Sequence, residues 1–326
     1  MTDFSGLADA RSGDWQGGGA TTETLAGGLA LASGVGLLAA KAMLVPRLNV
    51  NRDESFYLSH VHALIRGELR LVLQGAQTHL FRWVTLISRN EVDQVIAARW
   101  AMFTLLALSC MLLYRLALHW TSRAGAAYSA LGVLAVSSVM KHGASFGADS
   151  MLLPLLLGVL LLISAERRSV RADLAAAALL GAATAISIKA VLLVPVVVGL
   201  ALAAEVGPRR GRASAVISAG GRLPLIAAGG LAALRAIVLA HRLQLPPAGS
   251  VEPGSVLAVS FQKTLLETSL LPQKGWLLQT LKVDVMTWSM MGAGTLFALA
   301  RRRFDVAALA LSVSPVLFYR NTYPYY

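Results

Sequence analysis

The chain has few charged residues, a single cysteine and no nucleotide-phosphate loop. Only 14% of its 326 residues are charged, whereas 56% are hydrophobic, and the mean hydropathy is +0.63. This composition excludes an ordinary water-soluble domain. The one cysteine, Cys110, lies inside an apolar run, so an intrachain disulfide and a cysteine-ligated metal are excluded. No GxxxxGK(S/T) stretch occurs, so a bound nucleotide is not expected.

Apolar runs long enough to cross a bilayer recur along nearly the whole chain. A transmembrane helix needs about 20 apolar residues to span about 30 Å of hydrocarbon. The runs predict an all-α, polytopic integral membrane protein of about nine transmembrane helices. These helices are expected near 25–45, 100–118, 124–140, 151–165, 172–187, 190–205, 224–241, 285–300 and 304–319. Residues 1–24 lack the basic start of a signal peptide and are expected to form a disordered tail, which leaves 25–326 as one transmembrane domain.

Arginine clusters between the apolar runs predict the orientation of the chain. They follow the fourth, sixth and eighth predicted helices, which are alternate connections: Arg167, Arg168 and Arg171; Arg209, Arg210, Arg212 and Arg222; and Arg301, Arg302 and Arg303. Basic clusters of this kind mark the cytoplasmic side. The N-terminus is then cytoplasmic, and the long segments 46–98 and 242–284 are outer loops. Because the net charge of +12 is distributed in this way, it indicates membrane orientation and no nucleic-acid partner.

The first outer loop, 46–98, carries two sets of apolar residues at helical spacing. They are Phe56, Leu58, Val61, Leu64 and Ile65, and later Leu80, Phe81, Val84 and Leu86. Each set predicts an interfacial helix on the membrane surface. Such helices suit either a catalytic cradle or a simple anchor for the loop, and the pattern does not decide between the two.

Two adjacent carboxylates, Asp53 and Glu54, follow the first predicted helix. Carboxylates beside a membrane are costly to place and do not help a helix bundle to pack. At the outer end of the first helix they could take a proton from an acceptor or hold a cation. The alternative is that they cap an interfacial helix that begins near Ser55, since negative charge stabilises a helix N-terminus.

Several segments together resemble the first outer loop of GT-C membrane glycosyltransferases, in the branch of protein O-mannosyltransferases and the lipid A aminoarabinose transferase. They are Asn51-Arg52-Asp53-Glu54-Ser55-Phe56-Tyr57-Leu58, Ile65-Arg66-Gly67-Glu68-Leu69, Gln77-Thr78-His79-Leu80-Phe81 and Arg99 at the next helix. The ending Phe318-Tyr319-Arg320-Asn321-Thr322-Tyr323-Pro324-Tyr325-Tyr326 is similar to a later outer loop of bacterial members. The prolines that usually follow the family's histidine are absent after His79. Members usually continue beyond this point, so a shortened member or a fragment is expected.

The resemblance implies transfer of a sugar from a polyprenyl-phosphate donor to a glycan, lipid or protein acceptor, with inversion. The reaction would take place on the extracytoplasmic face of a bacterial plasma membrane. Asp53 is the expected general base, and Glu54 is expected to orient the acceptor or a cation, although the two roles could be exchanged. The sequence identifies no cofactor and leaves the need for a divalent cation open. The missing nucleotide loop favours the lipid-linked donor.

Further candidate residues lie on the predicted outer face. Arg99, Lys189 and Arg320 are expected to bind the donor phosphate, or else to act as snorkelling anchors at helix ends. His79 could contact the donor phosphate or a metal, or be a hydrogen-bonded structural residue. Asp149 could face the site or cap the following helix, and Tyr325 lies beside Arg320.

Two other functions remain open. A transporter or lipid flippase would place ionisable residues near the middle of the membrane on broken helices in two related halves, and no internal repeat is visible. The other alternative is a non-catalytic membrane subunit or an inactive fragment. It predicts that loss of Asp53 changes nothing except abundance.

Overall fold

The computed structural model describes residues 19–69, 75–164, 169–187, 190, 194, 196–198, 212–240, 289, 292–296 and 300. Within these residues all regular secondary structure is helical, which confirms the predicted all-α class for this part of the chain. The elements are α2 (Gly19–Leu44), α3 (Arg52–Ile65), α4 (Gly75–Leu80), η1 (Arg82–Leu86), α5 (Glu91–Ala117), α6 (Arg123–Ala135), α7 (Ser137–His142), α8 (Ala148–Ser164), α9 (Val170–Ile186) and α11 (Arg212–Ala240).

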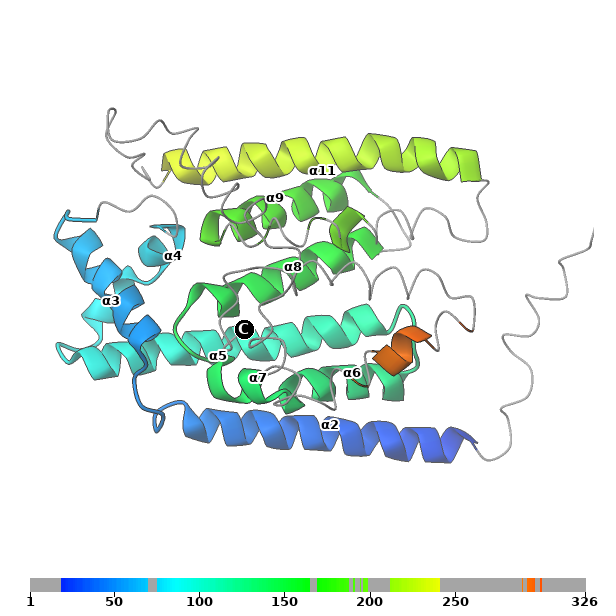
Figure 1. Cartoon of the computed structure of the whole chain (residues 1–326), viewed down its shortest axis with the longest axis horizontal. Coiled ribbons are helices and arrows are strands. Elements are labelled where there is room, and N and C mark those ends of the chain that lie inside the picture. Colours follow the sequence, from blue (N-terminus) through cyan, green and yellow to red (C-terminus); the bar gives the residue numbers. More distant parts are fainter. Residues whose placement is uncertain are drawn as a thin grey trace, which may run out of the picture.

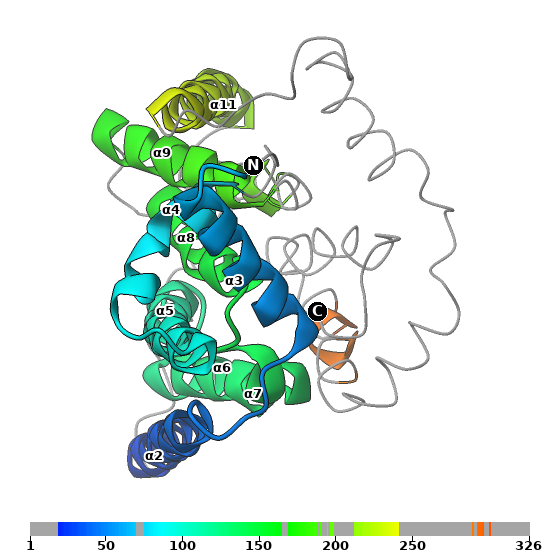
Figure 2. The ribbon, with the colours of Figure 1, turned by 90° about the vertical axis from the view of Figure 1, so that its left-hand side faces the viewer.

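The long helices lie side by side, and α3 and α4 gather at one end of them (Figure 1). We call this the α3 end. The order of packing is α2 on α6, α6 on α5, α5 on α8, α8 on α9, and α9 on α11. Seen from the α3 end, α3 lies obliquely across the ends of the long helices (Figure 2). The end of α2 and the starts of α5 and α8 therefore meet beneath α3 and α4.

Three of the described helices are long and apolar enough to cross a membrane. They are Thr21–Leu44, Glu91–Ala117 and Gly221–Ala240; Ala148–Ser164 is apolar but shorter. Large apolar side chains on α2 point away from the protein, among them Leu25, Leu29 and Val35. In water so much exposed apolar surface would be unfavourable, so these helices are compatible with a membrane protein. The predicted helices at 190–205, 285–300 and 304–319 lie wholly or mostly outside the described residues.

Helix boundaries differ from the sequence-based prediction at several places. The first helix begins at Gly19, inside the predicted tail, and α11 begins at Arg212 and passes through Pro224. The predicted helix at 124–140 is interrupted at Val136, whose ψ of 127° separates α6 from α7. Helix α5 begins at Glu91, well before the predicted start at 100, because Asn90 caps it and acidic residues occupy its first turn.

Small residues allow two pairs of helices to approach closely. A Cβ atom at Gly27 of α2 would lie 3.2 Å from the Cα of Ala124 in α6. A Cβ atom at Gly181 of α9 would lie 2.5 Å from the carbonyl oxygen of Gly230 in α11. Such contacts are typical of helices that associate within a bilayer, where van der Waals packing replaces the hydrophobic effect between helices.

A hydrophobic core packs α3, η1 and Phe81, which precedes η1, against α5, α8 and the end of α9. It includes Leu58, Val61, Phe81, Val84, Val95, Ala98, Met102, Phe146, Ala148, Met151 and Ile186. Each predicted amphipathic set is therefore only partly buried: Phe56, Ile65, Leu80 and Leu86 are exposed, whereas Leu58, Val61, Phe81 and Val84 are buried. The core fixes the position of α3 relative to the long helices, and with it the position of Asp53 and Glu54.

Candidate functional site

The adjacent carboxylates Asp53 and Glu54 occupy different environments. Helix α3 begins at Arg52, after Asn51, whose side-chain oxygen accepts a hydrogen bond of 2.9 Å from the backbone N–H of Glu54. The backbone N–H of Asn51 donates in return to Glu54 Oε2 over 3.0 Å, which completes a capping box. Successive residues of a helix point about 100° apart. Glu54 is therefore buried, with 0% of its surface exposed, while Asp53 is exposed.

Glu54 forms a buried bidentate ion pair with Arg99 of α5, which we call the Glu54–Arg99 clamp. Arg99 donates from Nε to Oε1 over 2.7 Å and from Nη2 to Oε2 over 2.6 Å. The side chain of Arg99 is only 3% exposed. The backbone N–H of Phe146, in the loop before α8, also donates to Oε1 over 3.0 Å. The clamp therefore joins the start of α3, the first turns of α5 and the loop between α7 and α8.

The remaining N–H groups of Arg99 hold the linker between α2 and α3. Nη1 donates to the carbonyl oxygens of Val45 and Leu48 over 3.1 and 2.7 Å, and Nη2 donates to that of Asn49 over 2.8 Å. Every N–H of the guanidinium group thus has an acceptor. The predicted contact of Arg99 with a donor phosphate would require one of these bonds to break. The oxygens of Glu54 are similarly occupied, so orienting an acceptor or a cation would disturb the clamp.

Asp53 adjoins a half-buried tyrosine, Tyr57, one helical turn later in α3. The ring of Tyr57 lies against the loop before α8, where a Cβ at Gly147 would be 3.5 Å from its Cε2 atom. Burial raises the pKa of the Tyr57 phenol, and the negative charges of Asp149 and Asp53 raise it further against the opposing effect of Gln77. Asp53, Tyr57 and Asp149 are therefore electrostatic neighbours at the α3 end.

Helix α4 contributes Gln77, Thr78 and His79 to the same region. Gln77 is 2% exposed, and neither atom of its amide has a hydrogen-bond partner in the part of the chain that the structure describes. His79 is half-buried on the last turn of this helix. Asp149 is half-buried in the first turn of α8, where both predicted roles, facing the site and stabilising the helix N-terminus, can be met.

The two histidines of α3, His60 and His62, contact neighbouring side chains. His62 Nε2 lies 2.9 Å from Gln94 Oε1 of α5, and the ring centroid of His60 lies 4.2 Å from that of Phe56. Burial lowers the pKa of His60. Among the described residues, no three His, Cys, Asp or Glu side chains come together in a group that could hold a metal ion. The divalent cation expected from the sequence has no candidate site in this part of the chain.

Two ionisable residues at this end, Lys41 and His142, are not among the predicted site residues. Lys41 of α2 is 1% exposed, and its Nζ donates to the carbonyl oxygens of Met140 and Lys141 over 2.6 and 3.1 Å, at the end of α7. His142 is half-buried beside it, and burial, followed by the charges of Lys41 and Lys141, lowers the pKa of His142. Lys41 could have been identified from the sequence, because it is an ionisable residue within the first apolar run.

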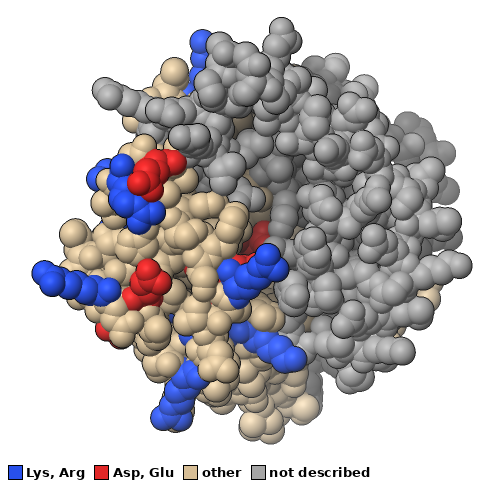
Figure 3. All heavy atoms as spheres, turned by 60° about the vertical axis from the view of Figure 1, so that its left-hand side comes forward, with Lys and Arg blue, Asp and Glu red and all other residues tan. Residues whose placement is uncertain are grey.

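The predicted site residues Lys189, Arg320 and Tyr325 lie outside the described residues. Figure 3 shows the molecule with the α3 end turned forward. Basic and acidic side chains are interspersed among uncharged ones, and neither sign forms a continuous patch over the described part. The described part of this face therefore offers single charged side chains to a ligand, and no extended surface of one sign.

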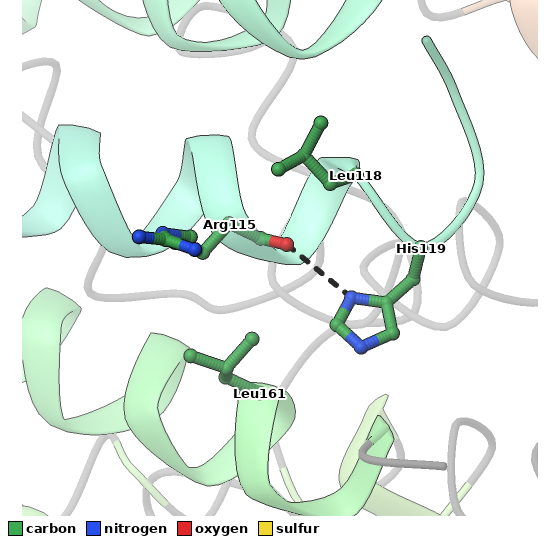
Figure 4. Close-up of a pocket in the computed structure, with 4 residues that line it drawn as sticks. All are labelled: Arg115, Leu118, His119 and Leu161. Atoms are coloured by element: carbon green, nitrogen blue, oxygen red, sulfur yellow. Dashed lines mark hydrogen bonds between the residues drawn. The ribbon is translucent and has the colours of Figure 1, made fainter. Parts of the chain in front are cut away.

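A hollow of about 630 Å³ lies at the opposite end of α5, lined by Arg115, Leu118, His119 and Leu161. The imidazole Nδ1 of His119 lies 3.3 Å from the carbonyl oxygen of Arg115 (Figure 4). None of the four lining residues is a carboxylate, and the hollow is remote from Asp53. It does not contribute to the chemistry proposed for the α3 end.

In comparisons with models of protein families, with curated proteins and with solved structures, nothing matches this chain.

Proposed function

We propose that the protein is a membrane glycosyltransferase that moves a sugar from a polyprenyl-phosphate donor to an acceptor at the α3 end, with Asp53 as general base. The observation that supports this most directly is the division between the two carboxylates. Glu54 is buried and fully hydrogen-bonded, whereas Asp53 is exposed on the first turn of a helix that is fixed to the bundle. A general base has to reach the acceptor hydroxyl, and of the two only Asp53 is accessible.

The clamp supports a positioning role for Glu54 in this proposal. A carboxylate that activates an acceptor has to be held in place, since small displacements cost much of the rate. The backbone of α3 is held at Asn51 and Glu54, and through Arg99 it is tied to α5. Asp53 therefore projects from a rigid turn. This geometry favours Asp53 as the base over the exchanged assignment.

The reaction is a single inverting displacement. The acceptor oxygen attacks the anomeric carbon, its proton passes to Asp53, and the polyprenyl phosphate leaves with the electrons of the broken C–O bond. The leaving phosphate requires positive charge nearby. Lys189 and Arg320 remain candidates for this role, and in the described part Arg47, Arg52 and Lys141 are exposed cations on segments that adjoin Asp53 or the clamp.

The test is Asp53→Asn in purified, donor-saturated enzyme. We expect loss of glycosyl transfer by about 10²-fold or more, with unchanged membrane insertion and unchanged thermal unfolding. Glu91→Gln is the matched control, because Glu91 is also an exposed acid in the first turn of a helix. Unchanged turnover in Asp53→Asn would refute the assignment. In Asp53→Cys, labelling only from the cytosol would refute the outer location of the site.

A further inference from the structure

Gln77 is an anomaly in the interior of the α3 end. Its side chain is 2% exposed, yet neither Oε1 nor Nε2 has a hydrogen-bond partner in the described part of the structure. Nearly all buried polar groups in proteins are hydrogen-bonded, because an unpaired amide loses its contacts with water without replacement. An amide left in this state calls for a partner from outside the described part of the structure.

Gln94 shows that burial alone does not leave an amide unpaired here. It is also 2% exposed, but its Oε1 lies 2.9 Å from His62 Nε2, and its Nε2 donates to the carbonyl oxygen of Ser88 over 2.7 Å. Both ends of this amide are therefore satisfied by the protein. The same residue type at the same end of the bundle thus has two different environments.

The surroundings of Gln77 are polar and adjoin Asp53. Helix α4 packs on α3, and Tyr57 of α3 lies against Gly147, two residues before Asp149. The Gln77 amide and the backbone of Ala148 both lie near enough to the Tyr57 hydroxyl to lower its pKa by hydrogen bonding, although the Gln77 amide does not reach the geometry of a full hydrogen bond. Tyr57 is half-buried, and Asp53 is exposed one helical turn before it in α3.

We propose that Gln77 and Tyr57 form a subsite for hydroxyl groups of a sugar. A hydroxyl can donate to Oε1 of Gln77 and accept from its Nε2 or from the Tyr57 hydroxyl, which supplies the partners that the amide lacks. The neighbouring carboxylates Asp53 and Asp149 disfavour an anion, so this subsite does not suit the phosphate of a donor. The inference rests on the proposed function, and the transfer kinetics described below distinguish a sugar of the donor from one of the acceptor.

The first test compares the same substitution at the two buried glutamines, in the full-length protein in detergent micelles. Methionine keeps the length of glutamine and removes the amide. Gln94→Met breaks two contacts and should lower the midpoint of thermal unfolding. Gln77→Met breaks no hydrogen bond within the described part of the chain and should leave the midpoint unchanged or raise it. An equal fall in both variants would overturn the proposal, since the Gln77 amide would then already be paired.

The second test measures ligand binding. Methyl glycosides of hexoses and pentoses should raise the unfolding midpoint of the wild-type protein, and this shift should be lost in Gln77→Met and in Tyr57→Phe. Inorganic phosphate is the control and should give no shift that depends on Gln77. The proposal fails if no glycoside stabilises the wild type, if the variants respond as the wild type does, or if phosphate gives the shift that depends on Gln77.

The third test uses transfer kinetics. Gln77→Met should raise the KM for one substrate about 3- to 10-fold with little change in kcat, and the substrate affected identifies the source of the sugar. If Asp53→Asn abolishes transfer while Gln77→Met leaves both KM values unchanged, only the subsite is wrong. If the wild type transfers nothing but glycosides still stabilise it through Gln77, the proposed function is wrong and the subsite stands.

Discussion

Replacing Arg99 by methionine would remove the cationic half of the Glu54–Arg99 clamp, together with the three hydrogen bonds from its guanidinium group to the linker between α2 and α3. Glu54, 0% exposed, would keep only the backbone N–H groups of Asn51 and Phe146 as partners. Breaking a buried pair in this way costs about 3–5 kcal/mol. We therefore expect Arg99→Met to lose about 4 kcal/mol of unfolding free energy.

The assay is unfolding in mixed micelles, followed by tryptophan fluorescence, for Arg99→Met, Glu54→Gln and the double variant. The double variant leaves no uncompensated charge and should be more stable than the sum of the single effects predicts, with a coupling of about 2–3 kcal/mol. Asp53→Asn, next to Glu54 but exposed, is the control and should stay within about 0.5 kcal/mol of the wild type.

A loss in Arg99→Met no larger than that of the control would refute this reasoning. So would strictly additive effects in the double variant, because the two groups would then not interact.

Two further predictions concern helix packing and pH. Gly181→Ala should destabilise the contact of α9 with α11 by about 1–3 kcal/mol, since its Cβ would lie 2.5 Å from the carbonyl oxygen of Gly230. Gly132→Ala is the control, because its Cβ meets nothing within 4 Å, and it should be neutral or slightly stabilising. Equal effects of the two substitutions on unfolding would contradict the close approach of α9 and α11. The pKa of His142 lies below its ordinary value of 6.5 because of burial and the charges of Lys41 and Lys141. The neutral imidazole therefore contributes folding stability that is fully present above pH 6.5 and is lost as the pH falls through the lowered pKa. His142→Gln should reduce the fall of the unfolding midpoint between pH 7.5 and 5, and an unchanged pH dependence would contradict it.

Local features of the α3 end could be predicted from the sequence. The acidic pair predicted a helix beginning near Ser55, and the structure places its start at Arg52, where Asn51 and Glu54 form a capping box. Helical periodicity also predicted that α3 and the segment after it would bury one face. The prediction did not identify which members of each set are buried, because this depends on where α5 and α8 lie.

The candidate site could be predicted only in part. The position of Asp53 and Glu54 after the first helix drew attention to both carboxylates, but local spacing does not show which of them faces inward. Arg99 was expected to contact a phosphate, since a guanidinium near the end of a helix suits that role equally well. Its partner in the structure lies 45 positions away in the sequence, and no local pattern indicates such a pairing.

The sequence by itself predicted the all-α class, which the described residues confirm. Apolar composition and helical periodicity are properties of short segments, so they can be recognised without knowing what each segment packs against. Only the tertiary structure decided the environment of each polar side chain. Lys41 finds its acceptors 99 and 100 positions away, and Gln77 finds none in the described part, although both are buried. The physical reason is that burial and hydrogen bonding are set by the neighbours that packing brings together, and these neighbours come from distant parts of the chain.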